Sequence, residues 1–154
     1  MTAVFLSLHV IVAIVAIGPI TVAGSMFPRA VRALAADPAD ASARTTAALL
    51  HRVCRGYAAL GVFLPVFGII TAVRMGVLGD VWVLVSLALT ALAAALLALL
   101  ILPRQRAVLA LAGENRSVPA SSAARLGMLV GIFNTLWAVV TVLMIVRPGS
   151  TTGV

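Results

Sequence analysis

The sequence contains no lysine and few of the side chains that carry out catalysis. Of its 154 residues, four are acidic, two are histidine and one is cysteine. Cys54 cannot form a disulfide within the chain, and it lacks the further cysteines and histidines of a metal site, so we expect a small buried or interfacial residue. The sequence also has no Walker loop, HExxH, CxxC, GxSxG or paired carboxylates. No catalytic residue and no metal site are therefore predicted.

Charge is scarce as well, and it falls almost wholly in the gaps between apolar runs. Charged residues make up 10% of the chain, hydrophobic residues 63%, and the mean hydropathy is +1.21. This composition excludes an ordinary water-solvated domain, and the length allows one domain. The net charge of +7 comes from arginine alone. Because membrane orientation accounts for such an excess, no nucleic-acid partner is predicted.

Four apolar segments are long enough to cross about 30 Å of hydrocarbon as helices. In lipid the backbone must satisfy its own hydrogen bonds, so a helical and not a strand conformation is expected. The first segment follows no basic residue and exceeds a signal-peptide core, which predicts a retained helix. The sequence predicts an all-α, compact antiparallel four-transmembrane-helix bundle over residues 1–148, with a disordered external tail at 149–154. The expected helices are approximately 3–27, 56–77, 81–102 and 126–146.

The arginines predict the orientation. Nine of them lie in the long connections before the second and fourth segments, whereas the short connection and the C-terminal tail offer only Arg74 and Arg147. By the positive-inside rule, both termini are external and both long connections are cytoplasmic. The Ala/Val-rich, lysine-free composition is typical of a high-GC bacterium, so the predicted location is the bacterial plasma membrane. The expected partners are anionic headgroups of the bilayer and other membrane protein subunits.

The connections contain recognisable helix boundaries. Asp37-Pro38 breaks the first connection into extensions of the first and second helices, and Asp37 or Asp40 is expected to cap the second. Pro103 is expected to disrupt the end of the third helix, and Ser121 or Ser122 to cap the fourth.

Small residues recur along each segment and predict close helix packing. In the fourth segment they include Gly127, Gly131 and Ala138, together with Asn134 and Thr135 as a polar part of the bundle core. The third segment carries Ser86, Thr90, Ala94 and Ala98 at the same spacing. Asn134 is expected to bond a hydroxyl or a backbone carbonyl freed by a proline. It is either structural or part of the lining of a substrate or quinone cavity.

His9 is the first candidate for a functional site. It lies about six residues inside the external boundary, roughly 9 Å by helix rise, and ionisable residues inside membranes are often functional. Three interpretations stay open: a packing histidine, a proton-handling imidazole and an axial haem ligand. His51 should lie near the opposite face, so a haem at His9 would need an open position or a methionine such as Met144.

A second candidate is a cytoplasmic basic face formed by Arg44, His51, Arg52 and Arg55 at the start of the second helix. These side chains would either contact anionic headgroups or dock a partner.

The Leu8-His9-Val10 segment early in the first of four crossings, followed by Pro28-Arg29, resembles a family of bacterial four-helix integral membrane proteins with a domain of unknown function. More distantly, it is similar to copper-resistance D-like and HemJ-type membrane proteins. In the HemJ-type family a first-helix histidine serves haem or porphyrin chemistry, and a lysine is expected in a later helix. The first resemblance implies the fold and no activity.

These features favour a non-enzymatic membrane protein that acts as an accessory or structural subunit of a larger assembly, with no cofactor. The alternatives are a haem-binding membrane oxidoreductase that uses His9, and a small carrier or channel lined by Asn134 and hydroxyl groups.

Overall fold

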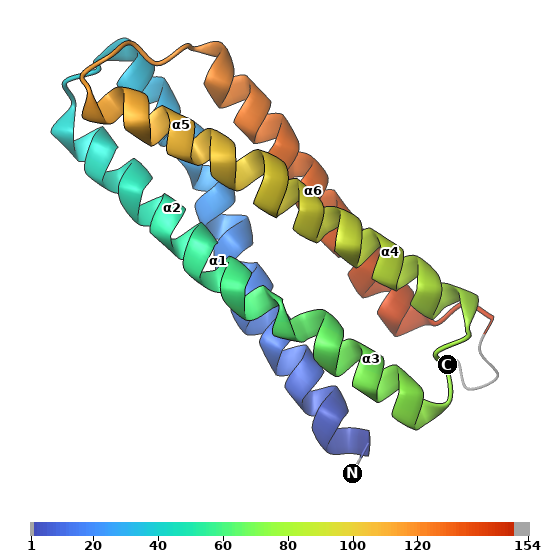
Figure 1. Ribbon diagram of the computed structural model, residues 1–154. Helices are drawn as coiled ribbons and strands as arrows, with labels where there is room; N and C mark the ends of the chain where they lie inside the picture. Colours follow the sequence, from blue (N-terminus) through green and yellow to red (C-terminus); the bar gives the residue numbers. More distant parts are fainter. Residues whose placement is uncertain (1, 150–154) are drawn as a thin grey trace.

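A computed structural model describes residues 2–149 and shows an elongated helical bundle (Figure 1). Within this range no strand occurs, and four helices are long and apolar enough to cross a membrane. They span Val4–Ala36, Ala41–Met75, Val81–Gly113 and Ser121–Val146. The all-α four-helix prediction is therefore confirmed. Of the predicted tail at 149–154, residues 150–154 lie outside the described range.

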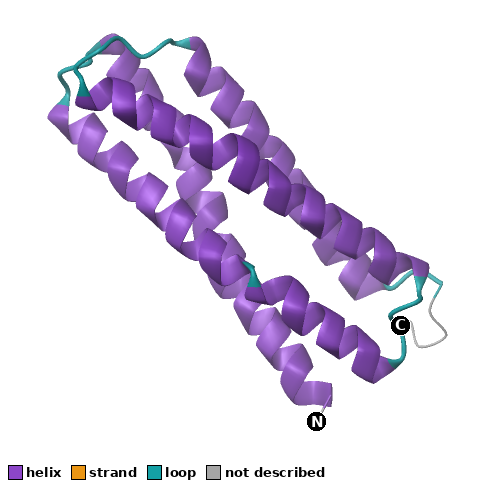
Figure 2. Ribbon diagram, viewed as in Figure 1, coloured by secondary structure: helices purple, strands orange, loops and turns teal. Residues whose placement is uncertain are grey.

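Two of the four crossings are divided into shorter elements. In chain order the elements are α1 (Thr2–Ala36), α2 (Ala41–Gly61), α3 (Phe63–Met75), α4 (Val81–Ala95), η1 (Leu96–Ile101), α5 (Leu102–Gly113) and α6 (Ser121–Val146). Figure 2 shows the break between α2 and α3 as a short loop within one continuous crossing. Pro65 follows this break by three residues and has no N–H to donate, so the helical ladder is weakened there.

The bundle has two distinct ends. We call the end with the chain termini and the 76–80 turn the terminal end, and the end with the connections 37–40 and 114–120 the loop end (Figure 1). The turn at the terminal end begins at Gly76, whose φ of +72° suits glycine, and Val77 N–H donates to the carbonyl of Ala72 over 3.0 Å. The nine arginines that the sequence places in the two long connections lie in the half of the bundle nearer the loop end.

Both helical extensions predicted for the first connection are present. α1 continues past Pro28 to Ala36, and α2 begins at Ala41. Asp40 caps α2, since its Oδ1 accepts from Ala43 N–H at 2.9 Å, whereas Asp37 accepts from Ala39 within the turn. The cap predicted for the fourth helix is absent: α6 begins at Ser121, and neither serine hydroxyl caps it.

The prediction for Pro103 is wrong in an informative way. The third crossing does not end there but continues to Gly113 through η1, a turn of π-helix in which Leu102 N–H donates to the carbonyl of Leu97. The wider turn shifts the register of the helix just before Pro103. The helix therefore continues past the proline, although Pro103 has no N–H to donate. The inward stripe accordingly follows Ser86, Thr90, Ala93, Leu97 and Ile101, and the predicted Ala94 and Ala98 are exposed.

Helix packing differs between the two ends. α1 lies against α2, α3 and α6, α4 lies against α6, and α2 lies against α5, but α3 approaches α4 closely in few places. The main hydrophobic core belongs to the loop-end half, around Phe27, Val31, Ile101 and Phe133. A small cluster of Ala72, Trp82 and Val83 closes the terminal end. Between these two clusters the helices leave a cavity.

Candidate ligand cavity

The cavity lies in the terminal half of the bundle and has a volume of about 910 Å³. This lies within the range of about 300–1,000 Å³ that is typical of sites for small organic ligands. Its walls come from α1, α3, α4 and α6, and most of the side chains that line it are aliphatic or aromatic. The few polar side chains on its walls are His9, Thr71, Thr141 and Arg147, together with the indoles of Trp82 and Trp137.

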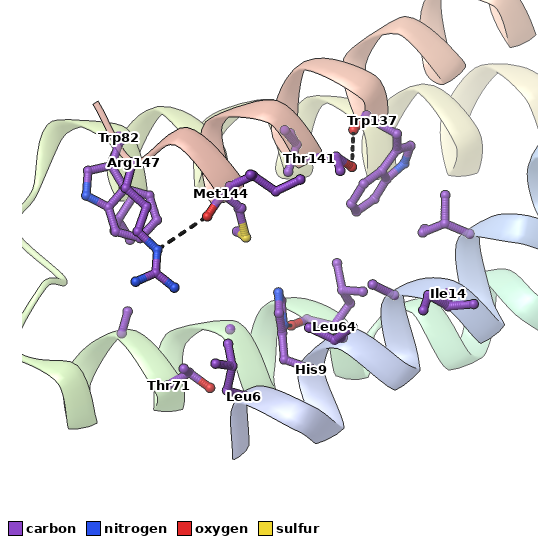
Figure 3. Close-up of a pocket in the computed structure, with 18 of the residues that line it drawn as sticks. Leu6, His9, Ile14, Leu64, Thr71, Trp82, Trp137, Thr141, Met144 and Arg147 are labelled. Atoms are coloured by element: carbon purple, nitrogen blue, oxygen red, sulfur yellow. Dashed lines mark hydrogen bonds between the residues drawn. The ribbon is translucent and has the colours of Figure 1, made fainter. Parts of the chain in front are cut away.

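His9 is a buried polar group on the wall of this cavity. Its side chain is 8% exposed, and its Nδ1 lies 3.1 Å from the carbonyl oxygen of Leu64 on α3. A carbonyl oxygen only accepts, so Nδ1 carries the proton and donates it. In the neutral imidazole Nε2 is then an acceptor with a free lone pair. Figure 3 shows the ring of His9 directed into the space between the two walls of the cavity.

Gly68 provides the surface on which the imidazole rests. A Cβ at position 68 would lie 3.0 Å from Cε1 and 3.3 Å from Nδ1 of His9, closer than ordinary packing allows. The ring is therefore held by two consecutive turns of α3: by the carbonyl of Leu64 and by the bare backbone of Gly68.

The opposite wall is formed by α6. Met144 lies across the cavity from His9 and directs its sulfur into the cavity (Figure 3). Trp137 lies further toward the middle of the bundle. The indole Nε1 of Trp137 is buried and has no hydrogen-bond partner within residues 2–149. Buried donors normally have partners, so this N–H is an unsatisfied donor in the wall of the cavity.

The terminal end of the cavity is cationic and aromatic. The guanidinium of Arg147 lies 5.9 Å from the ring centroid of Trp82, and its Nε donates to the carbonyl of Met144 over 3.4 Å. Trp82 in turn donates from Nε1 to Asp80 Oδ2 at 3.1 Å. Trp82 is 8% exposed, so it packs within the bundle at the terminal end of the cavity. Arg74 points outside, over the ring of Phe5.

Asn134 and Thr135 do not line the cavity. Asn134 Nδ2 donates to the hydroxyl of Ser25 on α1 over 3.2 Å, the hydroxyl partner that the sequence predicts. Thr135 was predicted to be part of the polar core, but it is exposed, and its hydroxyl donates to the carbonyl of Gly131 in its own helix. Gly131 is exposed too, with no atom within 4 Å of an added Cβ. This face of α6 therefore points away from the bundle.

The predicted basic face is also divided. Arg52 and Arg55 are exposed, whereas Arg44 donates through Nη2 to the carbonyl of Pro38 and to the side chain of Asn115, which ties the two loop-end connections together. His51 is 8% exposed and turned inward, so its assignment to a basic surface is wrong. The helical spacing that joins His51 to Arg44 directs both toward the neighbouring connections and α5.

His51 instead belongs to a buried polar cluster. Its Nδ1 donates to Gln105 Oε1 over 2.9 Å, and Gln105 Nε2 donates to Cys54 Sγ over 3.8 Å. Gln105 and Cys54 are both 0% exposed. The cluster joins α2 to α5 across the core, which accounts for the one glutamine of the chain within a helix. Cys54 is buried, as the sequence predicts.

The sequence identifies only part of the site. His9 and Met144 are predicted candidates, and both line the cavity. Gly68, Leu64 and Trp137 were not predicted as site residues. Every residue has a backbone carbonyl, so the sequence does not single out that of Leu64. Gly68 is likewise indistinguishable in the sequence from the other small residues on its helix. The pairing of α1 with α3 determines their role.

No protein-family model matches this chain, and neither a curated protein nor a solved structure does.

Proposed function

We propose that this chain is a multi-pass protein of the bacterial plasma membrane that holds haem in the terminal-half cavity. In this proposal His9 Nε2 would hold the haem iron, and the chain itself would contribute no acid–base catalysis. The observation that carries it is the hydrogen bond from His9 Nδ1 to the carbonyl of Leu64 beside a cavity of about 910 Å³. Histidines that ligate a metal almost always donate their other ring N–H to a carboxylate or backbone carbonyl, which orients the ring and raises its basicity.

The other side chains of the cavity suit the same group. The walls are apolar, as the macrocycle requires, and Met144 offers a thioether on the wall opposite His9. Arg147 at the terminal end of the cavity suits the carboxylate groups of a haem, because arginine pairs readily with carboxylates. When bound, haem would supply one-electron redox chemistry, and the protein would set its potential through the residue that holds the iron and the low polarity of the walls.

The absorption spectrum of the purified protein tests this proposal. Protein prepared in detergent from haem-replete cells should show a Soret band at about one haem per chain, a stoichiometry that follows from one His-lined cavity. A colourless preparation that also takes up no haem on titration would contradict it.

The orientation is part of the proposal. Nine arginines in the loop-end half and two in the terminal half support a cytoplasmic loop end and external termini. The cavity would then face the outer leaflet. Reporter fusions after residue 148 test this, and an intracellular reporter would contradict it.

A second candidate function is that of an accessory subunit in a membrane assembly. The outer face of α6 favours it, since Ala124, Gly131 and Thr135 are exposed together on one side of the helix. Small residues allow the backbones of neighbouring membrane helices to approach closely. Mild crosslinking followed by co-purification tests this function, and a chain always recovered alone would count against it. A carrier for polar solutes is less well supported, because Thr71 and Thr141 both donate to carbonyls of their own helices.

A further inference from the structure

We propose that the groove between α5 and α6 at the loop end binds an anionic phospholipid, with the lipid phosphate held between Arg104 and Arg125. The proposal is independent of haem binding, because this groove and the His9 cavity lie in opposite halves of the bundle. It depends only on the four crossings being embedded in a bilayer.

The groove exists because α5 and α6 diverge. α6 packs against α4 and η1 in the middle of the bundle but has few contacts with α5, and the connection 114–120 spans the gap. A hollow of about 200 Å³ remains, with Arg104 on one helix and Arg125 on the other. The remaining lining residues are Ala107, Val108, Leu111, Pro119, Ser122 and Leu126. A pair of arginines above an apolar floor, with one hydroxyl, matches a phosphate group joined to acyl chains.

The two guanidinium groups are available to a ligand. Arg125 forms no hydrogen bond or ion pair within residues 2–149, and Arg104 makes one 3.4 Å contact to the carbonyl of Leu100. Glu114, the acidic residue of the 114–120 connection, pairs with Arg116 at 3.3 Å. None of the residues that line the groove is acidic. The local charge therefore favours an anion.

The apolar surface continues from the groove toward the middle of the membrane. One turn from Arg104, Leu100 is 38% exposed, and one turn from Arg125, Met128 is 61% exposed. Arginines thus give way to exposed aliphatic side chains within about 5 Å of helix rise. A headgroup at the arginines would leave its acyl chains along this surface, as expected for lipid sites formed by basic pockets between transmembrane helices.

The test is a lipid titration of the delipidated full-length protein in neutral detergent, followed by native mass spectrometry. Phosphatidylglycerol is the probe, and phosphatidylcholine, whose cation offsets the phosphate, is the comparison lipid. The double variant R104Q/R125Q should bind phosphatidylglycerol about 25-fold more weakly than the wild type, about fivefold for each arginine. The matched control R52Q/R55Q removes the same charge from exposed positions on α2 and should bind as the wild type does.

Two further arms separate a built site from general attraction. A107F keeps both arginines but fills the groove from an exposed position, and it should lose phosphatidylglycerol while its circular dichroism stays unchanged. Inorganic phosphate at the same concentration should not displace the lipid, because it gains nothing from the apolar floor. Equal losses in R52Q/R55Q and R104Q/R125Q would overturn the proposal. So would unchanged binding in A107F or displacement by inorganic phosphate.

Discussion

The imidazole of His9 occupies the space that a side chain at position 68 would fill. Its Cε1 would stand 3.0 Å from a Cβ on Gly68, while its Nδ1 is bonded to the carbonyl of Leu64 one turn earlier on α3. Two helices that are far apart in the sequence thus fix one ring and leave its second nitrogen facing a cavity of about 910 Å³.

This relationship predicts that G68A weakens haem binding. The added methyl group pushes the ring away from α3 and strains its bond to Leu64, so the axial nitrogen is no longer held in place. Loss of such an orienting contact typically costs about 10–100-fold in affinity. Haem titration monitored at the Soret band measures it.

G18A is the matched control for that experiment. Gly18 also lines the cavity, but a Cβ there meets no atom within 4 Å. G18A should therefore bind haem as the wild type does. If both glycine variants bound haem equally well, the packing of the His9 ring against Gly68 would have no role in ligation.

A second prediction concerns the two faces of α6. Gly24 on α1 is buried, and a Cβ there would lie 3.3 Å from a methyl group of Val130, so G24L should destabilise the bundle by about 1–3 kcal/mol. G131L adds the same side chain to an exposed position of α6 and should leave stability unchanged in detergent. Thermal unfolding followed by circular dichroism compares the two. Equal destabilisation would mean that Gly131 faces a neighbouring helix of the bundle.

The buried pair His51 and Gln105 should behave as a coupled unit. Q105A leaves His51 Nδ1 without its acceptor in the core and should cost about 1–2 kcal/mol. In the H51A background the same substitution should lower stability by less, because no imidazole N–H remains that would lose its acceptor. A double-mutant cycle from unfolding in denaturing detergent gives the coupling. A coupling energy of zero would mean that the hydrogen bond between His51 and Gln105 does not stabilise the core.

The cap of α2 gives a fourth prediction. Asp40 Oδ1 accepts the N–H of Ala43, so D40A should destabilise by about 1 kcal/mol, whereas D40N keeps an acceptor and should be close to neutral. Unfolding midpoints of the two variants measure the difference. Equal destabilisation by both would point to the charge of Asp40 and not to the cap.

The crossings could be predicted from the sequence because lipid permits few alternatives. A run of about 20 apolar residues must form a helix there, so the four crossings and their turns follow from length and composition. The direction in which each helix faces is less constrained, since lipid accepts Gly131 and Thr135 as readily as the bundle does. His51 was misplaced for the same reason: spacing puts it on one face with Arg44, and only the position of Gln105 shows that this face is turned inward.

The cavity could not be predicted either. It lies where α1 and α3 stand apart from α4 and α6, and the break before Phe63 lies on the α3 side of it. Pro65 marks the break in the sequence but does not give its direction. His9 was found because a histidine within an apolar run is rare, whereas its two restraints on α3 involve a carbonyl and a glycine. Neither of these has a distinctive residue type.

The absorption spectrum of His9→Ala, beside that of His51→Ala, tests the central claim most directly. Both substitutions remove a buried imidazole, but only His9 faces the terminal-half cavity. If haem binds at His9, the Soret band should disappear in His9→Ala and persist in His51→Ala. A band that persists in His9→Ala, or a wild-type protein that binds no haem, would contradict it.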